Sequence, residues 1–221
     1  MAERRQHVLV AAAWTENRAD PPALGRLSGD GWRIEPVFAD QTALDRAGSR
    51  GRTPPPFQAL LWRELPAGEL VALDAVVPEA IRTVSERWAA LRLRAHPAWD
   101  DTTASNVEPQ IKQVSFLKAQ PDLTRSEFTR HFREHVAVAR VHHPAICRYV
   151  QHDVVETAGE HALDVQGVSE LWFADERILV DRYYASPESV AVVRADNREY
   201  IDFSGTLSLL VRPVDAAKRP S

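Results

Sequence analysis

The chain has 221 residues, enough for one large domain or for two domains of roughly 100 residues each. Its 27 Lys and Arg residues against 31 Asp and Glu residues give a net charge of −4, so nucleic acid is not expected as a partner. No run of about 18 apolar residues occurs, and we expect no membrane span. The single cysteine, Cys147, excludes an internal disulfide framework and a zinc site built from several thiolates. A reducing, cytoplasmic setting is therefore expected.

The first half of the chain is punctuated by proline and glycine, which favours short strands between polar loops. Apolar residues between positions 79 and 95 recur at three- and four-residue steps, and this spacing predicts an amphipathic helix. Residues 96–110 are polar and unpatterned, so the domain boundary is placed there. Three strands are expected before the helix, over residues 7–14, 32–39 and 57–64.

The second half has clearer signals. Thr124 and Glu127 form the pattern of a capping box, and Leu123 can pack on Phe128 as a hydrophobic staple, so a helix is predicted from this point. It should end near His142, because Pro144 follows. A second helix is expected to begin at Ser186-Pro187. Strands are expected over residues 111–118, 147–155, 168–174 and 206–212.

This order of elements, β-α-β-β-α-β, is that of a ferredoxin-like unit in an α+β protein, with two helices on one face of a four-stranded sheet. The other face must be buried against something else. The chain therefore divides into residues 1–105, residues 111–213 and a C-terminal tail, residues 214–221.

Three histidines, His131, His135 and His142, fall on the apolar face of the first helix of this unit. Each could donate a hydrogen bond to a backbone carbonyl or reach water at the edge of the stripe. Residues 131–135 also match the H-x-x-E-H zinc motif, but Glu134 projects about 100° away from His135 and no third ligand is evident. A haem or other metal site at His135 or His142 lacks visible partner ligands. No metal is predicted.

Five segments between Lys112 and Val211 stand out together. They read F-L-K, L-T-R-S-E-F-T-R-H-F-R-E-H, R-Y-V-Q, V-S-E-L-W-F-A-D, and A-S-P-E-S-V followed by D-N-R-E-Y-I-D. With these segments the chain resembles the EthD family of dimeric α+β barrel proteins. Glu127, Phe128 and His135 match the family pattern Glu-Phe-x-x-Tyr-Trp-x-x-His, whereas His131 and Phe132 replace its two aromatic residues.

The resemblance implies a pocket between the helices and the sheet that works without a metal or organic cofactor. Tyr149 and Gln151 resemble the family's Tyr-x-Gln/Asn strand, and Trp172 resembles its edge-strand aromatics, although Trp172 also fits a plain packing role. His135 and Tyr149 are the expected catalytic pair, acting on a hydrophobic small molecule. The expected substrate-binding residues are Phe128, His131, Phe132, Gln151 and Trp172.

These residues favour a cofactor-free enzyme of the lyase type, a dehydratase, decarboxylase or cyclase. His135 would transfer a proton on a polyketide-like or aromatic substrate, and Tyr149 would hydrogen-bond the developing enolate. Two alternatives stay open. One is a cofactor-independent monooxygenase for the same class of substrate, and the other is a non-catalytic accessory protein of an oxidase system.

The first half matches no motif of the family, yet it carries three expected strands and one expected helix. We expect it to be a degenerate second copy of the ferredoxin-like unit. Two copies in one chain would pack sheet against sheet as an intrachain pseudo-dimer, the barrel that single-copy proteins build as homodimers.

Overall fold

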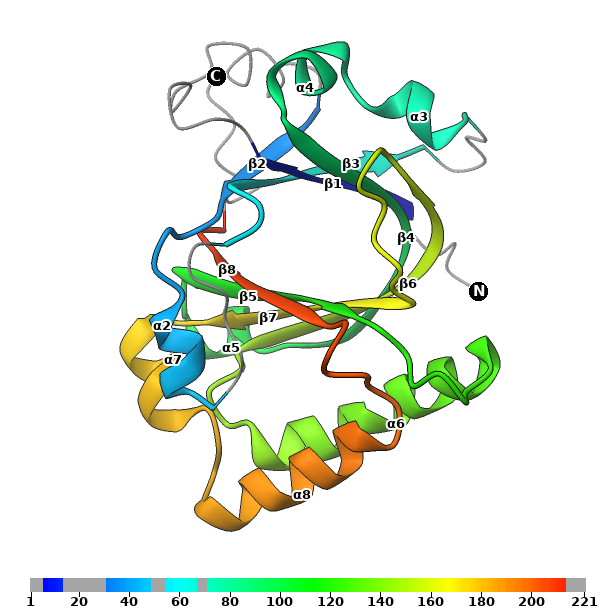
Figure 1. The fold of residues 1–221 in the computed structure, drawn as a ribbon. Coiled ribbons are helices and arrows are strands. Elements are labelled where there is room, and N and C mark those ends of the chain that lie inside the picture. The colour runs from blue at the N-terminus through cyan, green and yellow to red at the C-terminus, as the bar shows by residue number, and fades with distance from the viewer. Residues whose placement is uncertain (1–5, 14–30, 49–54, 67–70, 214–221) are drawn as a thin grey trace.

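The structure is a computed structural model and describes residues 6–13, 31–48, 55–66 and 71–213. Within these residues, eight antiparallel strands form one sheet that curves into a nearly closed barrel (Figure 1), so the expected α+β barrel class is confirmed. The strand order is β2-β3-β1-β4-β6-β7-β5-β8. The strands are β1 (Gln6–Ala13), β2 (Arg33–Pro36), β3 (Ala59–Leu65), β4 (Arg87–Asp100), β5 (Ile111–Leu117), β6 (Arg148–Ala158), β7 (Gly167–Phe173) and β8 (Leu207–Val211).

The two halves of the chain repeat one strand order. The first four strands lie as β2-β3-β1-β4 and the last four as β6-β7-β5-β8, so each half places its strands in the order second, third, first, fourth. β4 pairs with β6, and Val37, just after β2, forms a bridge with Val211 of β8. The fourth strand of each half therefore meets the second strand of the other. The two halves thus close one barrel between them, and the interpretation of the first half as a second copy stays a prediction.

The helix predicted over residues 79–95 is wrong. A short helix, α4 (Glu79–Val84), is followed by β4, which pairs with β1 on one side and β6 on the other. Leu91 and Leu93 belong to the core inside the barrel, and Arg92 lies between them, so the apolar residues of this segment also fit a period of two. The pairing of this segment with β1 on one edge and β6 on the other selects the strand over the helix. The boundary proposed after residue 105 follows the end of β4 and stays a prediction.

The helices predicted for the second half are confirmed. α6 (Arg125–His142) begins with the capping box, in which the Glu127 amide donates to Thr124 Oγ1 (3.3 Å) and the Thr124 amide donates to Glu127 Oε2 (2.8 Å). α8 (Pro187–Arg198) has Ser186 as its cap. Two helices that were not expected, α2 (Thr42–Arg46) and α7 (Glu176–Arg182), pack against each other beside this unit. Figure 1 shows α6 and α8 side by side below the barrel.

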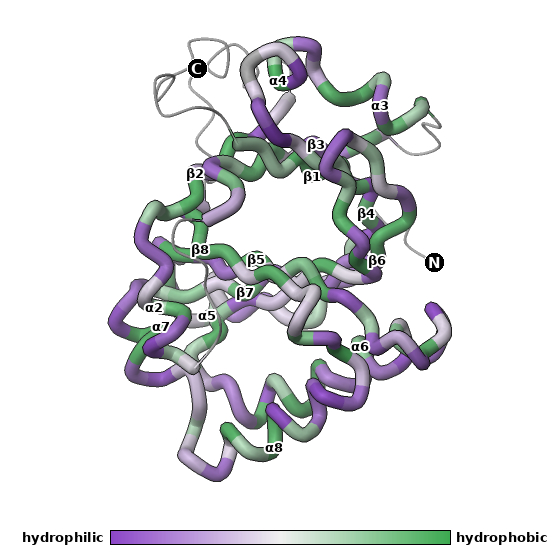
Figure 2. Tube along the Cα trace, viewed as in Figure 1, coloured by the Kyte–Doolittle hydropathy of each residue, from purple (hydrophilic) through white to green (hydrophobic). Residues whose placement is uncertain are grey.

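Apolar regions inside the barrel and on both outer faces of the sheet hold these elements together. The barrel interior takes side chains from both halves, including Leu9, Trp62, Val114 and Leu209. The outer face of the first-half sheet is packed by α3 (Leu73–Val76) and α4, and the outer face of the second-half sheet is packed by α2, α6 and α7. Figure 2 shows the strands mainly in hydrophobic colours, whereas α6 and α8 mix both kinds as amphipathic helices do. No helix among the described residues has the length and apolar character needed to span a membrane.

A buried ion cluster joins the two halves inside the barrel. Lys112 has no exposed surface, and its ammonium contacts Glu35 from the first half and Glu170 from the second, the latter at 2.6 Å. The rings of Trp62 and Trp172 flank the same ammonium, with centroids 4.7 and 5.0 Å away. Burial opposes the ionisation of Glu170, but the Lys112 charge and the hydrogen bond from His152 outweigh it and hold its pKa well below the usual range.

Candidate active site

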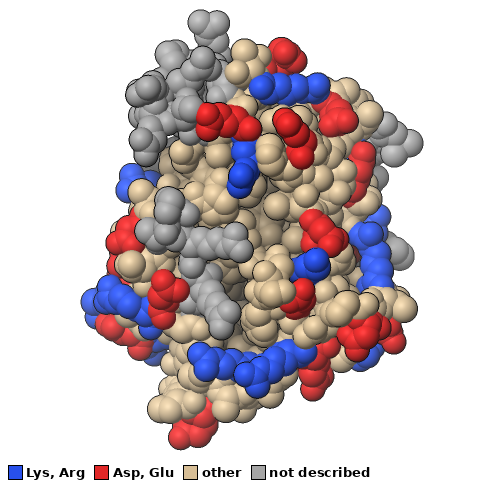
Figure 3. Space-filling model, in the orientation of Figure 1, with Lys and Arg blue, Asp and Glu red and all other residues tan. Residues whose placement is uncertain are grey.

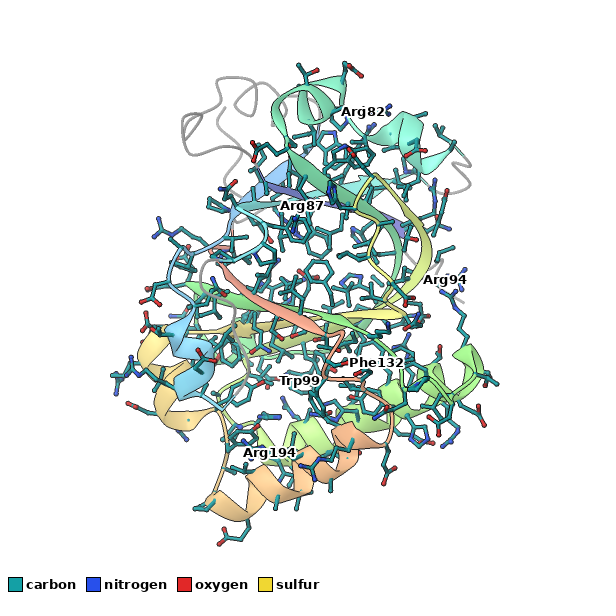
Figure 4. All side chains as sticks on the ribbon, in the orientation of Figure 1. Arg82, Arg87, Arg94, Trp99, Phe132 and Arg194 are labelled. Carbon is teal, nitrogen blue, oxygen red and sulfur yellow. The ribbon has the colours of Figure 1, made fainter. Side chains whose placement is uncertain are left out.

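A cavity of about 320 Å³ lies between the helix layer and the outer face of the second-half sheet. Its walls come from α6, α8 and the segment after α7, and its floor comes from β5, β6, β7 and β8. Figure 4 labels two residues that line it: Phe132, between the sheet and the two long helices, and Arg194, at the level of these helices. A volume of this size accepts a small organic molecule.

All four tyrosines of the chain line this cavity: Tyr149, Tyr183, Tyr184 and Tyr200. Burial raises the pKa of each of these hydroxyls above its usual value. The hydroxyls therefore stay protonated near neutral pH and can donate hydrogen bonds. Four rings with polar tips give the cavity apolar walls and a few fixed donors, which suits an aromatic ligand that carries oxygen.

His135 lies on the cavity side of α6 and is almost fully buried. Its Nδ1 lies 2.6 Å from Oδ2 of Asp196 on α8. A carboxylate only accepts hydrogen bonds, so Nδ1 carries the proton, and Nε2 keeps a lone pair when the ring is neutral. The Tyr200 ring, with its centroid 5.8 Å from that of His135, packs beside it. Asp196 thus fixes the orientation of a histidine that can accept a proton.

The Tyr149 hydroxyl is held by a hydrogen-bonded chain behind the cavity wall. Gln151 Nε2 donates to the Tyr149 hydroxyl oxygen (2.9 Å) and to the backbone carbonyl of Phe132. Arg133 donates to Gln151 Oε1 (2.8 Å), which fixes which end of the amide faces Tyr149. Because Tyr149 accepts from Gln151, its own proton remains for another acceptor, and the cavity is where a ligand would supply one.

The sheet floor of the cavity is polar. The Ser115 and Ser208 hydroxyl oxygens lie 2.8 Å apart, and Gln113 Nε2 donates to the Ser115 oxygen (3.0 Å). Ser169 lines the same floor from β7. Two exposed arginines of α8, Arg194 and Arg198, lie at its rim. Figure 3 shows basic side chains along the lower part of this face, at the level of α8.

His143, directly after α6, also lines the cavity, although no motif in the sequence points to it. Its Nδ1 lies 2.7 Å from the Tyr183 backbone oxygen, and its ring lies between those of Tyr183 and Tyr184. Burial lowers the pKa of His143 to about 4, even though the bond to the carbonyl works in the opposite direction. The only local signal in the sequence was the position before Pro144, which marks a helix end and not a cavity. Asp196 was missed as well, because its role depends on α8 packing against α6.

The three histidines of α6 do not converge. His131 Nδ1 faces Glu199 (3.8 Å), and His142 Nδ1 bonds the Ser189 hydroxyl (2.9 Å), so each histidine meets a different residue in or next to α8. Glu134 of the H-x-x-E-H motif pairs with Arg130 at 2.9 Å. Among residues 6–13, 31–48, 55–66 and 71–213, no group of three or more His, Cys, Asp and Glu side chains is placed to hold a metal ion.

The other expected substrate-binding residues are distributed over several places. Phe132 lines the cavity, whereas Phe128 lies in the adjoining core against Tyr200. His131 stacks parallel to Tyr200 outside the cavity lining, at 6.3 Å between centroids. Trp172 lies on the opposite face of the sheet, beside Lys112 in the barrel. A ligand-binding role for each of them stays a prediction.

Comparisons with known proteins agree with this architecture. The family model of the EthD domain matches residues 120–204. The crystal structure of an anthrone oxidase-like protein aligns over 97% of this chain and 93% of its own, with a TM-score of 0.57 and 11% identity. A proposed monooxygenase from Lactobacillus acidophilus NCFM aligns over 95% and 93%, with a TM-score of 0.53 and 6% identity.

At these identities the structures share the fold alone. No curated protein sequence gives a significant match. The match to the family covers α6, β6, β7, α7 and α8, which supply His135, Tyr149, His143 and Asp196. Over residues 120–204, this α+β barrel chain is similar to the EthD domain.

Proposed function

We propose that the chain is an enzyme that transfers protons on a hydrophobic, oxygenated ring compound bound in the tyrosine-lined cavity. The observation that carries this proposal is the pair formed by His135 Nδ1 and Asp196 Oδ2 at 2.6 Å, in the same cavity as the Tyr149 hydroxyl. A base with a fixed tautomer and a protonated donor are the two groups that enolate chemistry requires.

In the proposed reaction, Nε2 of His135 removes a proton from a carbon next to a carbonyl group. The Asp196 carboxylate stabilises the imidazolium that results, because opposite charges attract strongly at this distance in a partly buried site. Tyr149 donates its proton as a hydrogen bond to the developing enolate oxygen. Its raised pKa keeps this proton in place, while Gln151 holds the phenol oxygen.

The enolate can then follow a lyase route. In a dehydration, the electron pair of the enolate expels a hydroxyl group from the neighbouring carbon, and the imidazolium of His135 returns its proton to that group, which leaves as water. The histidine ends in its starting state. A dehydratase or cyclase of this kind needs no oxidant, and the proton is conserved within the site.

The second candidate is an oxygen-dependent reaction at the same base. Here the substrate carbanion is oxidised by molecular oxygen, which delivers one oxygen atom to the carbon and the other to water. What favours this candidate is the fold shared with proteins described as anthrone oxidase-like and as a monooxygenase. The chemistry begins with the same proton removal, so His135 has the same role in both.

Incubation with a phenolic tricyclic ketone in an oxygen electrode separates the two candidates. Turnover without oxygen uptake supports the lyase route, and equimolar uptake supports the oxygenase. We expect His135→Asn to lower kcat by roughly 10²- to 10⁴-fold, as loss of a general base does. His142→Asn is the matched control, since that histidine bonds Ser189 and does not line the cavity. A folded His135→Asn protein with unchanged turnover would contradict the proposal and favour a non-catalytic accessory role.

A further inference from the structure

A second histidine, His143, lines the cavity at some distance from His135. His143 is the residue directly after α6 and follows His135 by eight positions, so a rise of 1.5 Å per residue places it about 12 Å further along the helix axis. Both side chains line the same cavity. A ligand that reacts at His135 and extends along α6 therefore reaches the surroundings of His143.

The hydrogen-bonding state of His143 is set by its backbone partner. The Tyr183 carbonyl oxygen can only accept, so Nδ1 carries the proton. The other ring nitrogen, Nε2, then has a lone pair and acts as an acceptor. Among the residues that the structure describes, none is placed to donate a hydrogen bond to this Nε2.

The surroundings keep this acceptor rigid. The Tyr183 and Tyr184 ring centroids lie 4.6 and 5.0 Å from that of His143, so the imidazole is packed between two aromatic groups. A Cβ added to Gly48, just after α2, would lie 3.3 Å from the Tyr184 ring, so this segment packs closely against the tyrosine. Because the ring cannot rotate, the lone pair of Nε2 points in one direction, and a donor must lie in that direction to bind it.

The two histidines have opposite electrostatic settings. His135 is hydrogen-bonded to the Asp196 carboxylate, whereas His143 is hydrogen-bonded to a neutral carbonyl and is surrounded by rings. Burial of His143, together with the nearby His135 and His142, disfavours a charge on it. His135 is therefore equipped to move a proton, and His143 to accept a hydrogen bond without taking the proton.

We infer that His143 is a specificity subsite, which binds a hydroxyl group of the substrate at the end remote from the carbon that reacts at His135. The inference rests on the proposed function, since it assumes that the cavity holds a hydroxylated ring compound. It deepens that proposal by requiring a donor hydroxyl at the far end. A site built to accept such a hydrogen bond discriminates against the analogue without the hydroxyl, because its own acceptor is then left unpaired.

Two probes that differ by one hydroxyl test the subsite by calorimetric titration: naphthalene-2,6-diol and 2-naphthol. We expect the wild-type protein to bind the diol about 3- to 10-fold more tightly, the value of one neutral hydrogen bond. His143→Asn keeps an amide donor for the Tyr183 carbonyl but lacks the Nε2 acceptor, and it should bind both probes equally. His142→Asn, one residue away and bonded to Ser189, should keep the wild-type preference.

A measurement on the unaltered protein covers the case in which the His143 variant does not fold. The ¹⁵N resonance of His143 Nε2 should have the value of an unprotonated ring nitrogen and should move on addition of the diol but not of 2-naphthol. Equal binding of both probes by the wild-type protein, or an Nε2 signal that ignores the diol, overturns the subsite while leaving the role of His135 intact. Failure of both probes to bind overturns the subsite together with the ligand class proposed for the cavity.

Discussion

The outer faces of the two half-sheets have the same strand order, but the second-half face carries a polar patch among its apolar residues. In the first half, this face presents Val8, Val10 and Leu61, which are fully buried under α3 and α4. In the second half it presents Ser115 and Ser208 along with other polar groups, and a cavity remains between the sheet and the helices. The strand order, which both halves share, therefore does not decide which half has a cavity. The side chains on the outer face of each half-sheet decide it.

The two faces differ because the free energy gained by packing helices directly on a sheet depends on how much apolar surface the contact buries. Burial of apolar surface stabilises by roughly 25 cal/mol per Å², so an apolar sheet face draws its covering helices into contact. Hydroxyl and amide groups gain little from such closure and must keep their hydrogen bonds. In the second half, the hydrogen bonds among Gln113, Ser115 and Ser208 on the sheet provide these partners, and the helices leave space above the sheet.

The largest expected effect concerns the cluster that joins the two halves. Lys112→Met keeps most of the side-chain volume but leaves Glu35 and Glu170 buried without their cation, and should lower the free energy of unfolding by about 3–5 kcal/mol. Urea denaturation measures it. Lys118→Met, which breaks an exposed pair with Asp164, should cost under about 1 kcal/mol. Equal effects of the two changes would show that the cluster does not join the halves.

The next effect is a pH dependence that belongs to the second half alone. The unfolded chain protonates His143 below its ordinary pKa of 6.5, and the folded protein does so only below about 4. The unfolded state binds more protons in this window, so stability is complete above pH 6.5 and falls as the pH is lowered towards 4, by up to roughly 3 kcal/mol.

Unfolding curves at several pH values compare wild type with His143→Phe, which has no titrating group at this position. The variant should lose less stability between pH 7 and pH 4. Parallel pH profiles for the two proteins would show that His143 is charged in the folded state or exposed to water.

A smaller effect tests the two sheet faces directly. Val10→Thr places a hydroxyl of nearly the same shape on the apolar first-half face, where it finds no partner, and should cost about 1–3 kcal/mol. Ser208→Ala removes a hydroxyl from the polar floor, where water in the cavity can replace it as the partner of Ser115, and should cost under about 1 kcal/mol. The reverse order of the two costs in thermal or urea unfolding would contradict the comparison.

The smallest effect concerns the helices that cover each face. α6 begins with the Thr124 cap, whereas α3 and α4 lack a side-chain cap. Thr124→Ala should cost about 1 kcal/mol in urea unfolding. Thr129→Ala, within α6, is the control and should be neutral or slightly stabilising, because alanine has the higher helix propensity. A loss no greater than that of the control would mean that packing alone fixes the start of α6.

Local signals in the sequence predicted the second half well. The Thr124 and Glu127 capping box and the Ser186-Pro187 start depend on neighbours within a few residues, and both appear in the structure. Local signals do not identify β4, because its short apolar run fits a period of two as well as one of 3.6. Its pairing with β6, which is distant in sequence, selects the strand.

The candidate site also combines residues that local patterns indicate with residues that only distant contacts bring together. His135 and Tyr149 were singled out from a resemblance, and the structure places both in one cavity, but their partner Asp196 and the second histidine, His143, were not recognised. Nor did the sequence indicate that Lys112 is a buried ion rather than a surface one. Such roles depend on residues that meet only when helices pack on the sheet.

By itself, the sequence determined the ferredoxin-like order of the second half, the caps of its long helices and the histidine that faces its sheet, because these follow from patterns over a few residues. The tertiary structure alone decided that residues 87–100 form a strand and that this strand pairs with β6 to join the two halves. It also decided that the histidines of α6 separate and that the cavity lies over the polar face. Contacts between distant segments set these features, and no local pattern records which segments will meet.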